Sequence, residues 1–316
     1  MTSDWRDEFV LDARVRELGA RGRLRRLVRT GELERVGPGV YHAPAPAHLS
    51  PRRAADVAYL TQVRAAQLAS GEPLVLWGRS AAAAWSLPAV DPWPPKVHVL
   101  VDRAAGGRSS TTLHRHAVGR VEPVQVGGLF ATPLARTVVD IARSGTLREA
   151  VVVADAALRG LREAGGRVIR APISKEDLLA ELALVGTGPG TVQARLALRL
   201  ADGASGSVGE SCSRVGFHLL GLPAPQLQVT FYDRLGTIGT VDFWWPEFRL
   251  IGEFDGFVKY EDPAFLNGRT PQQTLRDEKV REDRLRKEGR GLTRWGWSTA
   301  LSLPALRAHL AEAGIR

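Results

Sequence analysis

Cysteine and long apolar runs are nearly absent from this chain of 316 residues. Its single cysteine, Cys212, can form no intramolecular disulfide and no cysteine-based zinc site. No apolar run reaches the roughly 20 residues of a membrane-spanning helix. The first residues, Met1 to Glu8, lack the basic and apolar regions of a signal peptide. We therefore expect a soluble, cytoplasmic protein without membrane association.

Lysine is scarce beside arginine, yet the net charge is +9 and the isoelectric point is about 10.3. Such a charge attracts polyanions, because phosphate contacts release counterions. DNA is therefore the expected partner, and arginine suits bidentate contacts to phosphate and guanine. A composition rich in arginine, alanine and glycine is also typical of a high-GC genome, so composition alone leaves both interpretations open. The length allows two or more domains.

Two apolar segments near the C-terminus carry three carboxylates. The segments 241–246 and 250–256 read as adjacent strands, with Asp242 on the first and Glu253 and Asp255 on the second. Because side chains alternate along a strand, Glu253 and Asp255 share a face, and Asp242 points away from its apolar neighbours. Acids on strands this apolar are usually compensated by a metal or a cation.

Carboxylates at this spacing fit the hydrolysis of a phosphodiester. Hard divalent ions such as Mg²⁺ or Mn²⁺, held by carboxylate oxygens, neutralise the anionic phosphorus centre and activate a water molecule. Lys259 follows the Gly256 turn and is placed to orient water or stabilise charge. An isolated strand acid such as Asp242 would equally fit a hairpin edge, but three acids, a glycine turn and a lysine together favour the metal site.

The stretch from Gly206 to Leu303 resembles the PD-(D/E)XK nuclease superfamily, in its very-short-patch-repair-like, DUF559-type branch. The matching positions are Glu210, Asp242, Glu253-Phe254-Asp255-Gly256, Glu278 to Asp283, and Leu292 to Trp295. The resemblance implies a central sheet flanked by helices. It also implies that Asp242, Glu253 and Glu210 hold the metal and that Asp242, Glu253, Asp255 and Lys259 form the catalytic set. For Glu210, a surface position on its helix is the alternative.

One position departs from the superfamily pattern. Asp255 stands two residues after Glu253, where the superfamily has lysine, so the lysine would have moved to Lys259 or Lys279. A version of the domain that binds DNA without cutting it is therefore the alternative.

A charged helix is expected from Thr274 to Gly289, followed by a closing strand from Leu292 to Trp295. Lys279, Arg281 and Arg294 are candidate DNA contacts in this part. Pairing among the helix's own glutamates and arginines is the equally open alternative.

The N-terminal part reads as a helical stretch from Trp5 to Leu18, a short basic helix over 22–31, and two short strands around Gly37-Pro38-Gly39. Helices followed by such a hairpin describe a winged helix, whose second helix enters a major groove. The alternative is a solvated basic face. The candidate DNA contacts on the basic helix are Arg23, Arg25, Arg26 and Arg29.

This N-terminal block resembles the N-terminal domain of AbiEi-type antitoxins, in which a short helix precedes arginine-Val-Gly-x-Gly-Val-Tyr. Here the hairpin reads Arg35-Val36-Gly37-Pro38-Gly39-Val40-Tyr41. The resemblance implies a transcriptional regulator of a type IV toxin-antitoxin system, with a cognate toxin or antitoxin as a possible protein partner.

A proline-rich link at 43–47 predicts a boundary, and we expect three domains: a winged helix over 1–47, a small mixed α/β domain over 48–185, and a nuclease-like domain over 186–316. The fold class is α/β or α+β. In the middle domain, His98, His114 and His116 lie on two predicted strands. No acid or cysteine stands in register with them, so we interpret them as exposed strand histidines rather than as a metal site.

Two functions remain. The first is a metal-dependent DNA endonuclease acting in mobile-element defence, toxin-antitoxin control or repair. The second is a non-catalytic, antitoxin-like DNA-binding regulator that retains the nuclease fold as a binding domain. Fold alone cannot separate them, because function depends on the site.

Overall fold

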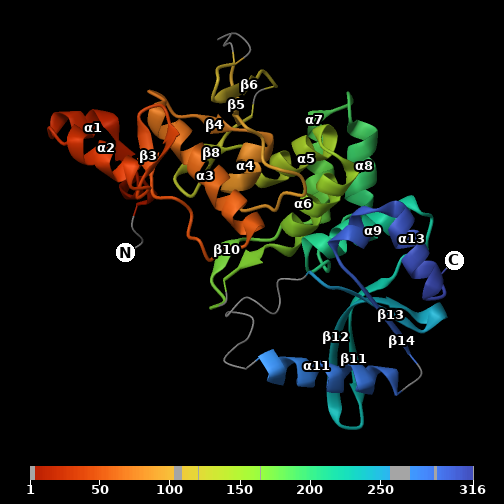
Figure 1. The fold of residues 1–316 in the computed structure, drawn as a ribbon. Helices are drawn as coiled ribbons and strands as arrows, with labels where there is room; N and C mark the ends of the chain where they lie inside the picture. The colour runs from red at the N-terminus through yellow and green to blue at the C-terminus, as the bar shows by residue number, and fades with distance from the viewer. Residues whose placement is uncertain are drawn as a thin grey trace. The chain divides into compact units, whose positions relative to one another are not determined.

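The computed structural model describes residues 4–102, 109–119, 121–163, 165–256, 271–287 and 290–315. Helices and sheets of mixed strand direction place the protein in the α+β class, as predicted. The chain folds into two compact units (Figure 1). Unit 1 comprises residues 1–144 and 176–188, and unit 2 comprises residues 145–175 and 189–316.

The N-terminal part of unit 1 is a short helical pair followed by a hairpin. Its elements are the 3-10 helix η1 (Trp5–Glu8), β1 (Val10–Leu11), α1 (Asp12–Glu17), α2 (Arg21–Arg29), β2 (Glu34–Gly37) and β3 (Val40–His42). The strands form a sheet in the order β1-β3-β2. The predicted helical stretch over 5–18 is interrupted between Glu8 and Asp12, because Val10 and Leu11 pair with Tyr41 and Val40 of β3.

The remainder of unit 1 is built on a second, five-stranded sheet in the order β6-β5-β4-β8-β7. Strands β5 and β6 are parallel, as are β4 and β8, whereas the other neighbours are antiparallel. The elements are α3 (Pro51–Ala69), β4 (Val75–Leu76), α4 (Gly78–Ala84), β5 (Val97–Leu100), β6 (Leu113–His116), β7 (Val124–Val126), β8 (Leu129–Ala131), α5 (Leu134–Ser144) and α7 (Lys175–Val185).

One hydrophobic cluster joins the two parts of unit 1. Trp5, Phe9 and Val40 from the N-terminal part pack with residues of α3 and of the five-stranded sheet, including Tyr59 and Leu76. Residues 1–47 therefore share a core with the segment that follows, which differs from the predicted boundary at residue 47. Residues 145–175, predicted in the middle domain, lie in unit 2.

Unit 2 contains a four-stranded sheet in the order β11-β12-β13-β14, with only the β13–β14 pair parallel. Its elements are α6 (Leu147–Arg159), β9 (Leu161–Arg162), β10 (Val168–Arg170), α8 (Thr191–Leu200), α9 (Val208–Leu219), β11 (Gln226–Asp233), β12 (Gly236–Trp245), η2 (Pro246–Phe248), β13 (Leu250–Phe254), α11 (Pro271–Arg286), β14 (Gly291–Trp295), α12 (Trp297–Leu301) and α13 (Leu303–Glu312).

The sheet of unit 2 is packed on both faces. On one face, Phe217 of α9 and Leu306 of α13 join an aromatic cluster with Phe243 and Trp295. On the other face, the fully buried Leu285 of α11 packs with Val241 and Ile251. Figure 1 shows α11 and the α9–α13 pair on opposite sides of this sheet. The candidate site lies among the strands that these helices cover.

Helix α6 ends at Arg159. Gly160 adopts φ +73°, and a Cβ there would lie 2.9 Å from the carbonyl oxygen of Arg170, so glycine is required where the chain turns into the β9–β10 hairpin. In the described part of the chain, no helix is long and apolar enough to cross a membrane.

Candidate functional site

Glu210 begins the site at the start of α9. Its backbone N–H donates to Ser207 Oγ at 3.2 Å, and its side-chain Oε2 accepts from the N–H of Gly206 at 2.7 Å. This reciprocal arrangement caps the helix, and a carboxylate in the first turn also suits the helix dipole. Glu210 is only 5% exposed, so it is not the surface acid that was the alternative.

The first turn of α9 lies close to β13 because residue 209 is glycine. A Cβ at Gly209 would lie 2.0 Å from the ring of Phe254, which no real contact permits. Phe254 is buried on the α9 side of the sheet. The Gly209–Phe254 contact therefore sets how near Glu210 comes to the strands.

Glu210 and Asp242 converge on one side-chain amide. Gln228 of β11 donates from Nε2 to Glu210 Oε2 at 3.0 Å and to Asp242 Oδ1 at 3.2 Å. Asp242 Oδ2 also accepts from the backbone N–H of Phe254 at 2.9 Å. Two carboxylates from a helix and a strand thus lie beside the same neutral donor.

Gln228 adopts an uncommon backbone conformation, with φ at +50°. A non-glycine residue in this left-handed region costs on the order of 1–3 kcal/mol and persists only where its surroundings hold it. Its contacts to the two acids supply such a constraint. Gln228 was not among the predicted site residues, because a glutamine in an alternating strand is distinguished only by its polarity.

Glu253 is held by two guanidinium groups. Its Oε1 accepts from Arg281 Nη2 at 2.7 Å, and its Oε2 accepts from Arg294 Nε at 2.8 Å. Burial alone would raise the pKa of Glu253, but the charges and hydrogen bonds of these arginines outweigh it and lower the pKa. Glu253 is therefore an ionised, half-buried carboxylate at neutral pH.

Arg281 and Arg294 are tied to the protein rather than extended from it. Arg281 also donates to the carbonyl of Thr240 at 2.8 Å, and Arg294 forms ion pairs with Glu278 at 3.2 Å and Glu282 at 3.3 Å. The acids Glu278 and Glu282 of α11 thus pair with an arginine of β14, and within the helix Arg286 pairs with Glu282 at 2.9 Å, which is the alternative to DNA contact. Lys279 is exposed.

Asp255 follows the end of β13. Its backbone N–H donates to the carbonyl of Trp295 at 2.9 Å, which continues the β13–β14 pairing. Among the described residues, its buried Oδ1 has no hydrogen-bond partner. A buried carboxylate oxygen in that condition is compatible with a cation ligand. Lys259, predicted to complete the catalytic set, lies outside the described residues.

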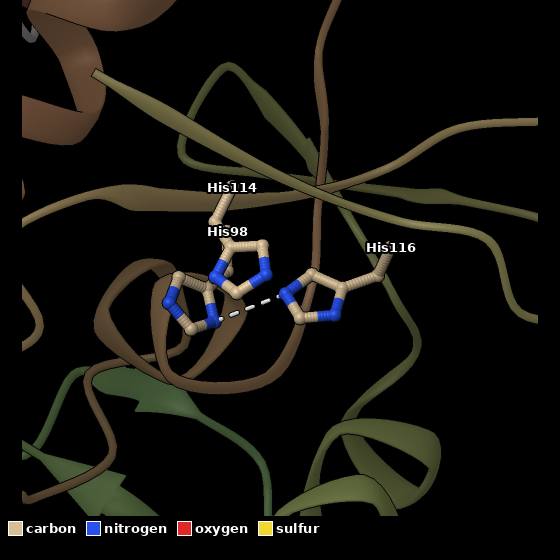
Figure 2. A group of neighbouring side chains, drawn as sticks. All are labelled: His98, His114 and His116. Atoms are coloured by element: carbon tan, nitrogen blue, oxygen red, sulfur yellow. Dashed lines mark hydrogen bonds between the residues drawn. The ribbon is translucent and has the colours of Figure 1, made fainter. Parts of the chain in front are cut away.

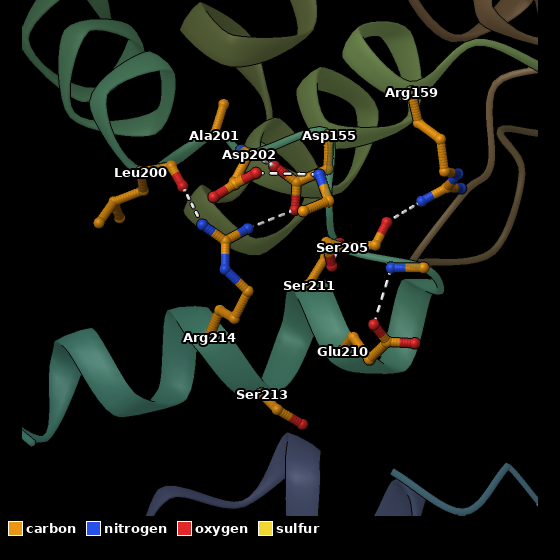
Figure 3. A network of polar contacts seen from close by, with 12 residues as sticks. Asp155, Arg159, Leu200, Ala201, Asp202, Ser205, Glu210, Ser211, Ser213 and Arg214 are labelled. Carbon is orange, nitrogen blue, oxygen red and sulfur yellow. Dashed lines mark hydrogen bonds and ion pairs between the residues drawn. The ribbon is translucent and has the colours of Figure 1, made fainter. Parts of the chain in front are cut away.

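A buried polar network holds α9 from behind (Figure 3). Arg214 of α9 donates from Nη1 to Asp155 Oδ2 of α6 at 2.7 Å and also bonds the carbonyl of Leu200. Asp155 Oδ1 accepts from the N–H of Asp202 at 2.7 Å. Burial raises the pKa of Asp155, and Arg214 opposes that rise. These bonds fix α9 to α6 and to the end of α8.

The oxygen donors of Glu210 and Asp242 are of the kind that Mg²⁺ and Mn²⁺ prefer. They lie close enough to share one amide nitrogen, and Asp255 adds a buried oxygen that has no hydrogen bond within the described residues. Glu253 is less suited, because both its oxygens already accept from arginines. Within the described residues, the acids do not form a group of three ligands around one point.

The basic helix α2 presents its arginines to solvent. The predicted DNA contacts Arg23, Arg25, Arg26 and Arg29 are all exposed. Arg25 and Arg29 line a shallow groove with Arg21, which is spaced one further turn along the helix, and with Tyr41 of β3. Arg21 was not predicted, although its spacing from Arg25 is the helical repeat of four residues.

Three histidines gather in unit 1 (Figure 2). His98 of β5 and His114 and His116 of β6 bring one ring nitrogen each within 4.8 Å of the others. Only His114 is exposed, whereas His98 and His116 are half-buried. The interpretation as exposed strand histidines is therefore wrong for two of the three.

The fold and the site define an α+β protein with an arginine-rich N-terminal helix and a cluster of carboxylates on a four-stranded sheet. No family model matches the chain. Two proteins of Mycobacterium tuberculosis, the uncharacterized proteins Rv2248 of strain H37Rv and MT2308 of strain CDC 1551, are each 31% identical to it over 240 residues, or 75% of this chain and 79% of the relative. The chain belongs to the family of these mycobacterial proteins.

Among solved structures, the crystal structure of the Rv2827c protein from Mycobacterium tuberculosis matches 71% of this chain and 83% of its own, at 16% identity and a TM-score of 0.34.

Proposed function

We propose that this protein is a cytoplasmic DNA endonuclease dependent on Mg²⁺ or Mn²⁺, with its active site in unit 2. The observation that carries the proposal is the convergence of Glu210 and Asp242 on the amide of Gln228. Two half-buried or buried anions beside one neutral donor leave negative charge that a divalent cation would compensate. The net charge of +9 supports a nucleic-acid substrate.

In this proposal, Glu210 and Asp242 supply the principal metal ligands, and Asp255 supplies a further oxygen. The bound ion would lower the pKa of a water molecule and neutralise charge on the scissile phosphate. Gln228 holds the two carboxylates in register with each other. Arg281 and Arg294 keep Glu253 ionised on the neighbouring strand.

The basic face of α2 supports DNA binding by unit 1. Its exposed arginines, without an acid in the helix itself, suit contacts to a phosphate backbone. The proposed protein would thus hold DNA through unit 1 and cut it through unit 2.

A second function is favoured by one specific observation. Both oxygens of Glu253 accept hydrogen bonds from arginines, so cations of the protein already occupy the place where a metal would neutralise this acid. A nuclease-like unit stabilised in that way fits a DNA-binding regulator that does not cut, with a cognate toxin or antitoxin as its protein partner.

The experiment is a cleavage assay on supercoiled and linear DNA with Mg²⁺ or Mn²⁺. The variants are Asp242→Asn and Glu210→Gln, which keep side-chain size, and the control is Glu247→Gln, an exposed acid of the same unit. Metal-dependent nicking lost in both site variants and kept in the control supports the endonuclease.

DNA binding is measured with the same preparations by fluorescence anisotropy. Tight binding without cleavage by any variant, weakened by Arg25→Ala, would overturn the endonuclease and support the regulator. Loss of both activities in a site variant requires circular dichroism to confirm that unit 2 is folded.

A further inference from the structure

The three histidines of unit 1 come together because of strand pairing. Strands β5 and β6 are parallel, with His98 opposite His114 and Leu100 opposite His116. Paired residues of neighbouring strands share a face, and residues two apart on one strand do so as well. His98, His114 and His116 therefore project from one face of the sheet, at its β6 edge.

The separation of their nitrogens suits a metal ion. His98 Nδ1 and His116 Nε2 are 3.3 Å apart, and a ligand nitrogen from each of the three residues lies within 4.8 Å of the others. Two nitrogens bound tetrahedrally to one Zn²⁺ at about 2.0–2.1 Å would be roughly 3.3–3.4 Å apart. The His98–His116 separation already equals that value, and Figure 2 shows a nitrogen of His98 facing one of His116, with the His114 ring stacked beside His116 at 4.4 Å between centroids.

The surroundings hold two of these rings in place. Trp77 lies against His116 with ring centroids 4.0 Å apart, and its ring plane is nearly parallel to that of His98, with centroids 6.4 Å apart. The backbone N–H of His98 donates to Ser80 Oγ at 2.7 Å, and that hydroxyl also bonds Tyr59. Rings packed in this way need little reordering when they bind a ligand.

His98 and His116 are available as neutral ligands. Burial, together with the neighbouring histidines, lowers the pKa of His98 and of His116 to about 4. Neutral imidazole is the form that binds metals. The nearby cation Arg79 is paired with Asp91 at 3.5 Å.

We propose that His98, His114 and His116 bind one divalent transition-metal ion, with Zn²⁺ as the preferred ion and water in the remaining position. An all-nitrogen ligand set selects Zn²⁺, Co²⁺, Ni²⁺ and Cu²⁺ and disfavours Mg²⁺, which prefers oxygen. The site is therefore chemically separate from the carboxylate cluster and does not depend on the proposed nuclease activity. A bound ion would join the edge strand β6 to β5.

The test is a titration of the metal-stripped, full-length protein with Zn²⁺ by calorimetry, and with Co²⁺ by visible absorption. We expect one equivalent of Zn²⁺ and the intense visible bands of tetrahedral Co²⁺. His114→Ala removes an exposed ligand, so it should leave the fold intact. It should weaken Zn²⁺ binding by more than the roughly 10- to 100-fold typical of losing an outer-sphere partner. His116→Cys, which keeps a zinc ligand, should restore most of the affinity that His116→Ala loses.

Matched controls separate this site from other histidines and from the carboxylates. His48→Ala and His218→Ala change exposed histidines elsewhere and should leave binding unchanged, as should Asp242→Asn. Absence of stoichiometric Zn²⁺ binding would overturn the proposal. Zn²⁺ binding as strong in His114→Ala and His116→Ala as in the unmodified protein would overturn it as well. The His98–His116 contact would then be a hydrogen bond between neutral rings.

Discussion

Arg214 of α9 and Asp155 of α6 form an ion pair in which Nη1 and Oδ2 are 2.7 Å apart and the side chain of Asp155 is fully buried. The pair joins two helices that are far apart in sequence and fixes the helix that carries Glu210. The position of Glu210 in the candidate site therefore depends on this buried ion pair as well as on the acids of the site.

Asp155→Ala should destabilise unit 2 by about 3–5 kcal/mol, because it leaves Arg214 without its buried partner. Chemical denaturation followed by circular dichroism measures the change. Glu312→Ala, at an exposed acid of α13, is the control and should change stability by no more than about 0.5 kcal/mol. Equal, small effects of the two substitutions would contradict the structural role of the pair.

Gly209→Ala should also destabilise unit 2, because the added methyl group would overlap the Phe254 ring. Overpacking of this kind typically costs about 1–3 kcal/mol. The same change at Gly165, where a Cβ meets no atom within 4 Å, should be close to neutral. If Gly209→Ala unfolds at the same denaturant concentration as wild type, α9 does not approach β13 as closely as described.

Mg²⁺ should stabilise the wild-type protein if the carboxylate cluster holds it. At a concentration a hundredfold above the dissociation constant, the gain is about 2.7 kcal/mol. Asp242→Asn should remove that gain, whereas His114→Ala should keep it. Thermal unfolding with and without Mg²⁺ provides the measurement, and a Mg²⁺ effect of the same size in Asp242→Asn would argue against the site.

Arg25→Ala should weaken DNA binding and reduce its dependence on salt. Loss of one phosphate contact lowers the slope of log K against log salt concentration by about 0.9. Arg195→Ala removes the same charge from an exposed position on α8 and should leave the slope unchanged. Binding titrations at several salt concentrations distinguish a contact on α2 from a general effect of charge, which would lower both slopes equally.

Tyr59 should ionise late. Burial raises its pKa from 10.0 to about 12, against the opposing hydrogen bond to Ser80. Because the unfolded phenol ionises first, the stability from the neutral buried phenol is complete below pH 10 and is lost as the pH rises toward 12.

An alkaline absorbance titration measures this ionisation, and Tyr59→Phe should remove the late step. Tyr232→Phe, at a 63% exposed position, is the control and should leave the late step in place. If both variants lose the same step, Tyr59 is not shielded.

Local patterns predicted many elements of the fold. The apolar alternation around Asp242 and Glu253 gave β12 and β13, and the short basic helix predicted over 22–31 is α2, Arg21–Arg29. The strand β1 was predicted as helix, because its pairing with β3 is a contact with residues about 30 positions away and leaves no local signal.

The candidate site was predictable in its acids but not in their partners. Glu210, Asp242 and Glu253 stand out by type and position. The contacts of Gln228, Arg281 and Arg294 join residues that are between 14 and 41 positions apart, and no spacing rule reaches that far. Gln228 was therefore missed, and Arg281 and Arg294 were predicted to contact DNA before the structure paired them with Glu253.

Each of the two units is made of two separate segments of the chain, which affects how the protein can be divided into fragments. Residues 145–175 leave unit 1 for unit 2, and residues 176–188 return before the chain enters unit 2 for good. A single cut cannot release either unit whole. A fragment starting at residue 186 would lack Asp155 and leave Arg214 uncompensated, and one ending at residue 144 would lose α7. Deletion studies of the two proposed activities would thus remove stability together with function, and point substitutions are the sounder way to separate them.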